Sequence, residues 1–188
     1  MLHDSLVRLD HHGIAHLPDN IGHINVTGRD GWGRAFCAGV RLAIKFGYDY
    51  LAYCDADIIC TQPVQPIIGK LHKAGVKAAC PWDSTYNFPE NGLMYLSVPY
   101  LRDSEFTRRY GWGDRTRTPD PLQIPEMVFE RLMGDDLFIL PMRGLRNDLD
   151  QLTVNNFQYR FPYGVDYLTH CKDFRLYEML LQRKGIVL

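Results

Sequence analysis

The sequence has no apolar run long enough to cross a membrane, no paired-cysteine spacing and almost no net charge. A membrane-spanning helix needs roughly 20 consecutive apolar residues, and no segment of the chain approaches that length. The first residues, MLHDSLVRLDHH, include acidic side chains and lack the apolar stretch of a secretory signal. We therefore expect no transmembrane segment and no secretory signal.

Cysteine is present, but its spacing matches no known cysteine framework. The five cysteines are odd in number and scattered, without a C-x-x-C pair: Cys37, Cys54, Cys60, Cys80 and Cys171. This spacing argues against a disulfide framework and against a structural zinc site. Small core thiols fit a reducing compartment, so we expect a cytoplasmic protein.

Neither sign of charge is in excess. The chain has 21 Lys and Arg and 22 Asp and Glu, a formal net charge of −1, which favours neither a nucleic-acid partner nor an anionic membrane. An anionic ligand must therefore be held by a local site. The 188 residues, 46% of them hydrophobic and 23% charged, suit a soluble protein without a linker or repeat, so we expect one domain over 1–188.

Helical and strand-like segments alternate along the chain. Apolar periodicity and turn residues predict helices at 33–46, from Pro63 to near Gly75, at 125–133 and at 175–182. Short apolar runs predict strands at 48–54, 76–80, 93–98, 136–141 and 163–173. Residues 81–92 look irregular, and 110–123 look like a surface loop that shapes a site. This alternation indicates an α/β sandwich with a largely parallel sheet.

Two aspartates interrupt the apolar segment YLAYCDADIIC. Asp55 and Asp57 are two residues apart, so in an extended chain their carboxylates point to the same side. They follow a core strand, and ligands of open α/β sheets bind at the carboxyl ends of strands. Two converging carboxylates need compensation, for which Mg²⁺ or Mn²⁺ with substrate phosphates is suited. The alternative is that both residues belong to a turn and face water.

The surroundings of this pair resemble a known superfamily. The segment GRAFCAGVRLAIKFGYDYLAYCDADII is similar to the helix, strand and D-x-D motif of GT-A-type glycosyltransferases. Three later segments, ENGLMYLS, IPEMVFERLMGDDLFILP and THCKD, are similar to further parts of that fold in the same chain order. The resemblance implies a GT-A-like three-layer α/β/α sandwich with a mostly parallel central sheet. Because Asp55 comes early, it also implies a shortened N-terminal nucleotide-binding half.

The resemblance assigns roles to individual residues. It implies a Mn²⁺ or Mg²⁺ ion held by Asp55, Asp57 and His170. It also implies that Asp55 and Lys172 contact the nucleotide diphosphate and that Asn91 lines the donor sugar. Asp135 and Asp136 resemble the acidic pair that supplies a general base in inverting members, although a strand cap is an equal alternative. Whether the reaction inverts or retains configuration stays open.

Three further residues are candidates by position. Arg34 stands near the start of a predicted helix, where its charge and the backbone N–H groups suit an anion, although a simple turn and cap is the alternative. Trp82 and Asp83 follow the predicted strand 76–80, where an aromatic face and a carboxylate suit a donor sugar. The pair His11 and His12 has no partners at ligand spacing and is interpreted as a surface pair.

The function that these expectations favour is a metal-dependent glycosyltransferase, which moves a sugar from a nucleotide-sugar donor to a hydroxyl acceptor. One alternative is a catalytically impaired glycosyltransferase-like domain for binding or assembly, with a homo-oligomer as one form of assembly. A phosphatase of the haloacid dehalogenase type also uses two aspartates one residue apart. The residues after that pair, Ile58 and Ile59, and its place within the chain disfavour this last interpretation.

Overall fold

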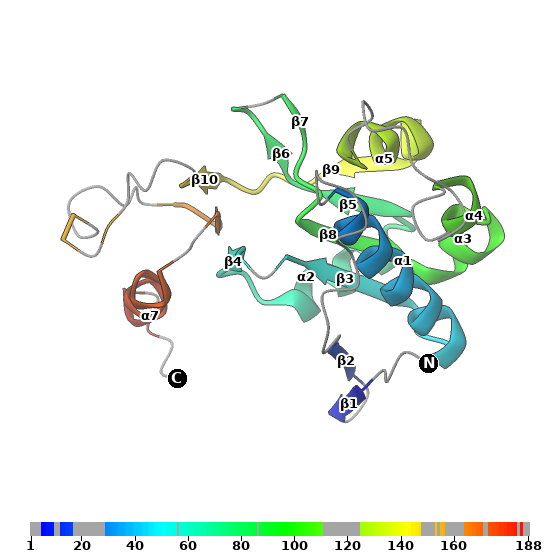
Figure 1. Ribbon diagram of the computed structural model, residues 1–188, viewed down its shortest axis with the longest axis horizontal. Helices are drawn as coiled ribbons and strands as arrows, with labels where there is room; N and C mark the ends of the chain where they lie inside the picture. The colour runs from blue at the N-terminus through cyan, green and yellow to red at the C-terminus, as the bar shows by residue number, and fades with distance from the viewer. Residues whose placement is uncertain are drawn as a thin grey trace. The chain divides into compact units, whose positions relative to one another are not determined.

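The computed structural model describes residues 5–9, 12–16, 29–55, 57–85, 87–110, 125–147, 153, 155–156, 164–170, 173–183 and 185. These residues form an α/β structure with four sheets (Figure 1). The chain divides into two compact units, each built from two separate segments. The first unit comprises residues 1–51 and 96–135, and the second comprises residues 52–95 and 136–188.

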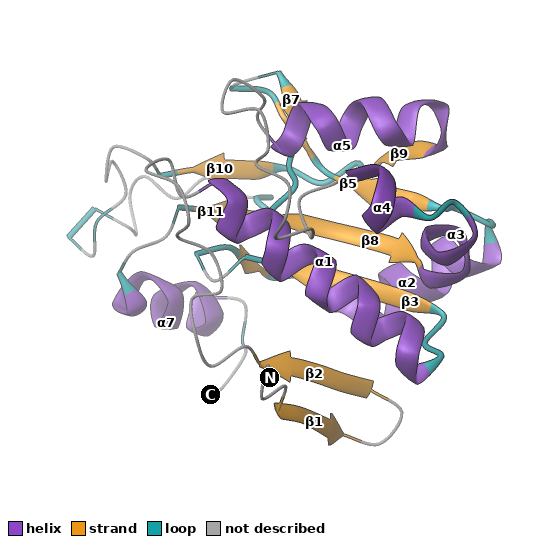
Figure 2. Cartoon of the chain, turned by 45° about the vertical axis from the view of Figure 1, so that its right-hand side comes forward, coloured by secondary structure: helices purple, strands orange, loops and turns teal. Residues whose placement is uncertain are grey.

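The described residues of the first unit form a hairpin and four helices. The hairpin pairs β1 (Ser5–Leu9) with β2 (His12–His16) in antiparallel fashion. The helices are α1 (Arg29–Phe46), α3 (Val98–Asp103), α4 (Phe106–Tyr110) and α5 (Pro125–Met133). Figure 2 shows α1 running alongside α3 and α4, in agreement with the contacts among these helices.

An aromatic cluster fills the interior of the first unit. Phe36 in α1 packs edge-on against Phe106 and Phe129, at centroid distances of 5.9 and 6.4 Å. Phe36, Val40 and Ala43 recur at helical spacing and are buried, which explains why this stripe of α1 faces the other helices. Such edge-to-face pairs stabilise a core beyond the area that they bury.

Glycine ends helix α1. Gly47 has φ of 69°, a left-handed conformation that costs glycine little. Its N–H donates to Ile44 O at 3.1 Å, and Tyr48 N–H donates to Ala43 O at 3.1 Å. These two bonds form a Schellman cap, as the predicted helix end at this glycine requires.

The second unit holds most of the strands. It contains β4 (Ile59–Cys60), α2 (Val64–Lys73), β5 (Ala78–Cys80), β6 (Trp82–Asp83), β7 (Phe88–Pro89), η1 (Gly134–Asp136) in part, β9 (Leu137–Ile139), β10 (Gly144–Arg146), β11 (Tyr167–Thr169) and α7 (Phe174–Arg183). Two strands, β3 (Tyr50–Cys54) and β8 (Leu93–Ser97), have residues in both units. The order of the largest sheet is β3-β8-β5-β9.

Pairing directions are mixed. β5 and β9 are parallel, and so are β10 and β11, whereas β11 and β4 are antiparallel. β6 and β7 form an antiparallel hairpin within the stretch 81–92, for which the sequence pattern predicts no regular element. The predicted α/β class is confirmed, with sheets that are partly parallel.

Several element boundaries differ from prediction. Helix α5 has the predicted bounds, but α1 begins at Arg29 rather than at residue 33. The long strand predicted over 163–173 is confined to Tyr167–Thr169, and the sequence pattern does not predict α3 and α4. The predicted loop 110–123 lies almost wholly outside the described residues.

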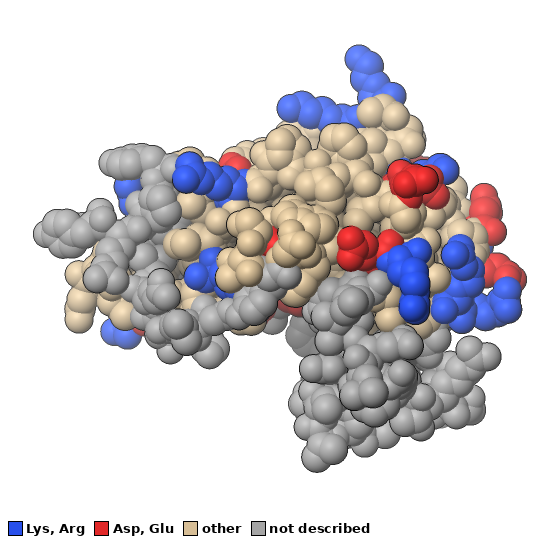
Figure 3. Space-filling model, turned by 90° about the horizontal axis from the view of Figure 1, so that it is seen from above, with Lys and Arg blue, Asp and Glu red and all other residues tan. Residues whose placement is uncertain are grey.

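Surface charges are mixed, and the described cysteines form no disulfide. On the face drawn in Figure 3, acidic and basic side chains lie beside one another, and the described residues there form no continuous area of one sign. Cys54 and Cys60 are free thiols, Cys37 and Cys80 are buried, and Cys171 lies outside the described residues. None of the helices in the described ranges combines the length and apolar character that crossing a bilayer requires.

Candidate functional site

Two parallel strands of the second unit lead into one pocket. β5 and β9 pair in parallel, and Leu140 N–H extends the pairing to Cys80 O at 2.8 Å. After their carboxyl ends, β5 continues into the β6–β7 hairpin and β9 continues into β10. Ligands of α/β proteins bind at such carboxyl ends, so this edge is the place to look for a site.

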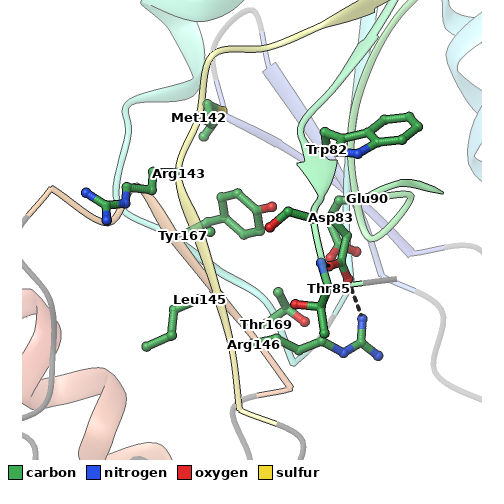
Figure 4. A pocket seen from close by; sticks show the side chains of 12 residues that line it. Trp82, Asp83, Thr85, Glu90, Met142, Arg143, Leu145, Arg146, Tyr167 and Thr169 are labelled. Atoms are coloured by element: carbon green, nitrogen blue, oxygen red, sulfur yellow. Dashed lines mark hydrogen bonds and ion pairs between the residues drawn. The ribbon is translucent and has the colours of Figure 1, made fainter. Parts of the chain in front are cut away.

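A polar pocket of about 230 Å³ lies beyond these strand ends (Figure 4). The hairpin and its flank contribute Trp82, Asp83, Ser84, Thr85 and Glu90; the segment through β10 contributes Met142, Arg143, Gly144, Leu145 and Arg146; β11 contributes Tyr167 and Thr169. All twelve residues belong to the second unit. The pocket is therefore formed by segments that are far apart in sequence but lie within one compact body.

A buried ion pair crosses the pocket. Arg146 Nη1 donates to Asp83 Oδ2 at 2.9 Å, and the two side chains are 19% and 5% exposed. Thr85 N–H donates to the other carboxylate oxygen of Asp83 at 2.7 Å. The Arg146 guanidinium and the Thr85 N–H together compensate the negative charge of Asp83. Asp83 is the carboxylate that the sequence analysis predicts to contact the donor sugar.

Glu90 presents a second carboxyl to the same pocket. Glu90 is 7% exposed. Its Oε1 accepts a hydrogen bond from the Gly92 N–H at 3.2 Å, whereas its Oε2 is buried without a hydrogen-bond partner. Burial raises the pKa of Glu90 to about 7; the charges of Asp83 and Asp55 add to this, while the Gly92 N–H and Arg146 oppose it. A carboxyl group with such a pKa exchanges a proton near neutral pH, as groups at reactive sites commonly do.

Two uncharged polar side chains near Glu90 are also buried without partners. Asn91 is 2% exposed, and neither its amide oxygen nor its amide nitrogen has a hydrogen-bond partner. Thr169 is 3% exposed, and its hydroxyl also lacks a hydrogen-bond partner. Buried polar atoms are nearly always paired, so these groups mark a place where a ligand or water completes the hydrogen bonding.

Asp55 lies beside Gly92, at the start of β8. Its N–H donates to Gly92 O at 2.8 Å, and Tyr53 Oη donates to Asp55 Oδ1 at 2.8 Å. A Cβ atom at Gly92 would lie 3.0 Å from Asp55 Oδ2 and 3.1 Å from Glu90 Oε1, and would also collide with Ile58. Asp55 and Glu90 thus flank a backbone position that only glycine fits. Burial is the main cause that raises the pKa of the Tyr53 phenol, and Asp55 adds to it.

Asp57 and His170 lie at the same end of a strand pair. β4 and β11 are antiparallel, with Leu168 opposite Ile59. Asp57 stands two residues before Ile59, and His170 stands two residues after Leu168. His170 has φ of 59°, a strained conformation for a non-glycine residue, and such strain often occurs at functional positions.

The predicted metal ligands do not form a ready-made centre. Across the described part of the chain, no three His, Cys, Asp and Glu side chains are grouped so that they could hold a metal ion. A carboxylate oxygen donor is nevertheless present beside Gly92, because Asp55 Oδ2 would lie 3.0 Å from a Cβ atom at that position. This chemistry fits a hard ion such as Mg²⁺ or Mn²⁺, and binding of the ion stays a prediction.

The proposed general bases lie elsewhere. Asp136 immediately precedes β9, and its Oδ1 pairs with Lys77 Nζ at 2.7 Å just before β5. Because β5 and β9 are parallel, Asp136 lies at their amino ends, whereas the pocket lies beyond their carboxyl ends. Its neighbour Asp135 is exposed in η1. The structure therefore does not bring Asp136 together with Asp83, and its catalytic role stays a prediction without support from its position.

Several other predicted residues lie wholly or partly outside the described residues. Arg34 is within α1, but its side chain lies outside the described residues, as do Lys172 and His11. His12 begins β2, opposite Leu9. The predictions for donor contacts at Arg34 and Lys172 are thus neither supported nor opposed by geometry.

Of the residues that line the pocket, the sequence analysis names only Trp82 and Asp83, and it misses four whose chemistry matters most. Glu90 stands in the segment ENGLMYLS, but the resemblance points to the adjacent Asn91 instead. Arg146, Tyr167 and Thr169 have no local motif, and their partners lie far away in sequence. Among these four, only Glu90 has a local sequence signal, since an acidic residue followed by Asn-Gly stands directly before the mainly apolar strand LMYLS.

No family model matches the chain, and no curated protein sequence matches it either.

Proposed function

We propose that this protein is a metal-dependent glycosyltransferase, which transfers a sugar from a nucleotide-sugar donor to a hydroxyl acceptor. One observation supports this most directly. Asp55, Asp83 and Asn91 come from three separate strand ends, and they converge around Gly92 and Glu90 beside one polar pocket. All three are candidates for donor binding on the sequence alone.

The proposal includes the finer architecture. The order β3-β8-β5-β9 and the parallel pair β5–β9 are compatible with a GT-A-like three-layer sandwich with a mostly parallel central sheet. A single functional domain over residues 1–188 is part of the same proposal. The two compact units then represent parts of one enzyme.

The side chains of the site have distinct tasks in this proposal. Asp55 and Asp57, with His170, would hold the divalent ion, and their side chains would have to draw closer together to do so. When bound, Mn²⁺ or Mg²⁺ neutralises charge on the nucleoside diphosphate leaving group. Asp83, held in place by Arg146, accepts hydrogen bonds from sugar hydroxyls, and the amide of Asn91 both accepts and donates them. Glu90 is the carboxyl group that the pocket offers for proton exchange with a hydroxyl.

Calorimetry tests the metal and donor sites together. A thermal-shift screen of UDP-, GDP- and CDP-sugars with and without Mn²⁺ first selects the nucleotide, because a ligand of the native state raises the melting temperature. We expect the selected donor to bind only with Mn²⁺. Asp57→Asn should weaken binding by at least about tenfold, whereas Asp103→Asn should not, since Asp103 is exposed and pairs with Arg102.

Two results would count against the proposal. Donor binding that is unchanged in Asp57→Asn or independent of Mn²⁺ would remove the metal site. Donor binding without transfer to any hydroxyl acceptor or to water would favour a binding or assembly domain instead. Transfer is measured as release of the nucleoside diphosphate.

A further inference from the structure

The pocket beside β6 and β10 contains four charged side chains, and their arrangement leaves one of them uncompensated. Asp83 and Arg146 pair at 2.9 Å, so their charges largely cancel. Arg143 is exposed, and Figure 4 shows its guanidinium directed away from the pocket. Glu90 Oε2 remains, buried and without a hydrogen-bond partner. Among the described residues that line the pocket, an entering anionic group would therefore meet a carboxyl and find no available cation.

The other groups of the pocket suit a neutral ligand with many hydroxyls. The buried Thr169 hydroxyl lacks a partner and can both donate and accept. Trp82 and Tyr167 add aromatic surface to the lining. At about 230 Å³ the pocket is smaller than the roughly 300 to 1,000 Å³ of sites for drug-sized ligands. It fits one ring of a larger ligand rather than a whole nucleotide-sugar.

A phosphate or a carboxylate is disfavoured by the same groups. Above about pH 7 Glu90 is ionised, and in that range its carboxylate repels a second negative charge in this partly buried place. The guanidinium of Arg146, the usual partner for an acid, is already engaged by Asp83. The diphosphate of a donor thus belongs outside this pocket, and only its sugar belongs inside.

We infer that this pocket binds the sugar ring of the donor, that it selects a neutral sugar over one that carries a carboxylate, and that Glu90 is the residue that makes this selection. The inference rests on the proposed glycosyltransferase function. It adds a specificity that neither the D-x-D pair nor the predicted metal site would provide, because those groups contact the nucleotide diphosphate.

A matched pair of donors tests the selection. UDP-glucose and UDP-glucuronic acid differ only in a hydroxymethyl or carboxylate group at C6, as do GDP-mannose and GDP-mannuronic acid. The pair with the nucleotide chosen by the screen is titrated by calorimetry with Mn²⁺ at about pH 8, where Glu90 with its pKa of about 7 is ionised. The free nucleoside diphosphate is the reference. We expect the neutral donor to bind at least about tenfold more tightly than the acidic donor.

Glu90→Gln tests the assignment to one residue. This variant keeps the size of the side chain and removes its charge, so we expect the acidic donor to bind about tenfold more tightly than it does to the original protein, with the neutral donor within about threefold. Glu105→Gln is the matched control, because Glu105 is exposed and pairs with Arg108; its discrimination should match that of the original protein. Melting temperatures of both variants verify that they fold.

Each outcome has a separate meaning. Equal binding of the two donors to the original protein overturns this inference and leaves the proposed function standing. Discrimination that persists in Glu90→Gln overturns the role of Glu90. If the variant does not fold, saturation-transfer NMR of the original protein with methyl glucoside and methyl glucuronide decides, and equal signals overturn the selection. Failure of every nucleotide and nucleotide-sugar to bind overturns the proposed function and this inference with it.

Discussion

The ring of Tyr167 lies directly against the backbone of Gly144, its partner in the parallel pair β10–β11. A Cβ atom at residue 144 would lie 2.5 Å from Tyr167 Cε2 and would also collide with Cζ and the hydroxyl oxygen. The absence of a side chain at Gly144 is therefore what allows Tyr167 to line the pocket. This contact leads to the first prediction.

Gly144→Ala should destabilise the protein by about 1 to 3 kcal/mol, because the added methyl group forces the tyrosine ring or the strand to move. The free energy of unfolding in urea measures this change. Gly39→Ala is the control: apart from its own helix backbone and chain neighbours, nothing lies within 4 Å of its Cβ position in α1. Alanine in a helix is more stable than glycine by about 0.5 to 1 kcal/mol. In a Tyr167→Leu background the cost of Gly144→Ala should shrink, and an unchanged cost would contradict the contact.

Removal of Arg146 should be far more costly than removal of a surface arginine. Arg146→Ala leaves Asp83 buried with its main charged partner gone, so we expect a loss of about 3 to 5 kcal/mol in the free energy of unfolding. Arg102→Ala breaks an exposed pair with Asp103 and should cost at most about 1 kcal/mol. Similar losses for the two variants would show that the Arg146–Asp83 pair is solvated in solution.

Glu90 should make the stability of the protein depend on pH near neutrality. Its pKa is raised from 4.5 to about 7 in the folded protein, mainly by burial, so the folded state binds the proton more tightly than the unfolded chain does. This contribution is fully present below pH 4.5 and is lost as the pH rises through about 7. The corresponding free energy is on the order of 3 kcal/mol.

Comparison with Glu90→Gln isolates this effect from all other titrating groups. Between about pH 5 and about pH 8, in the presence of a chelator, the original protein should lose stability relative to the variant. Urea unfolding at several pH values measures the difference. A difference that stays constant over this interval would mean that Glu90 titrates at its ordinary pKa.

Asp166 should hold the strand ends that border the pocket. Its carboxylate accepts hydrogen bonds from Gln62 Nε2 at 2.6 Å and from the Arg143 N–H at 2.8 Å, and so joins the end of β4 to the start of β10. Asp166→Asn replaces one acceptor with a donor, which should cost about 1 to 3 kcal/mol of stability. Asp103→Asn, at an exposed carboxylate, is the control. Hydrogen exchange of the Arg143 amide should accelerate only in Asp166→Asn.

Local signals in the sequence are sufficient for several elements. The helix end at Gly47 and the bounds Pro125–Met133 are predicted correctly, because caps and turn residues act within one or two turns of the chain. The β6–β7 hairpin escapes prediction, since its strands have two residues each and show no alternation that exceeds chance. Short strands are defined by their partners rather than by their own pattern.

In the candidate site as well, local sequence signals predict some features and miss others. The strand-end positions of Asp55 and Asp83 point to the edge of the sheet where the pocket lies, because the chain direction of a strand defines its carboxyl end. The same reasoning, applied to Asp136, places it at the amino end, since it precedes its strand. The partnership of Asp83 with Arg146 depends on tertiary folding across a long sequence separation, which no local pattern records.

The two compact units are interleaved along the chain, which crosses between them near residues 51–52, 95–96 and 135–136. A fragment that stops after residue 135 would keep β5 and lose β9, so that β5 would become an open edge with no neighbour on that side. A fragment that begins at residue 52 would lack α1 and its aromatic contacts. Deletion from either end thus exposes an unpaired strand edge or an apolar face, and it does not yield an independently folded domain. Stepwise truncation should therefore produce aggregates rather than a smaller soluble fragment.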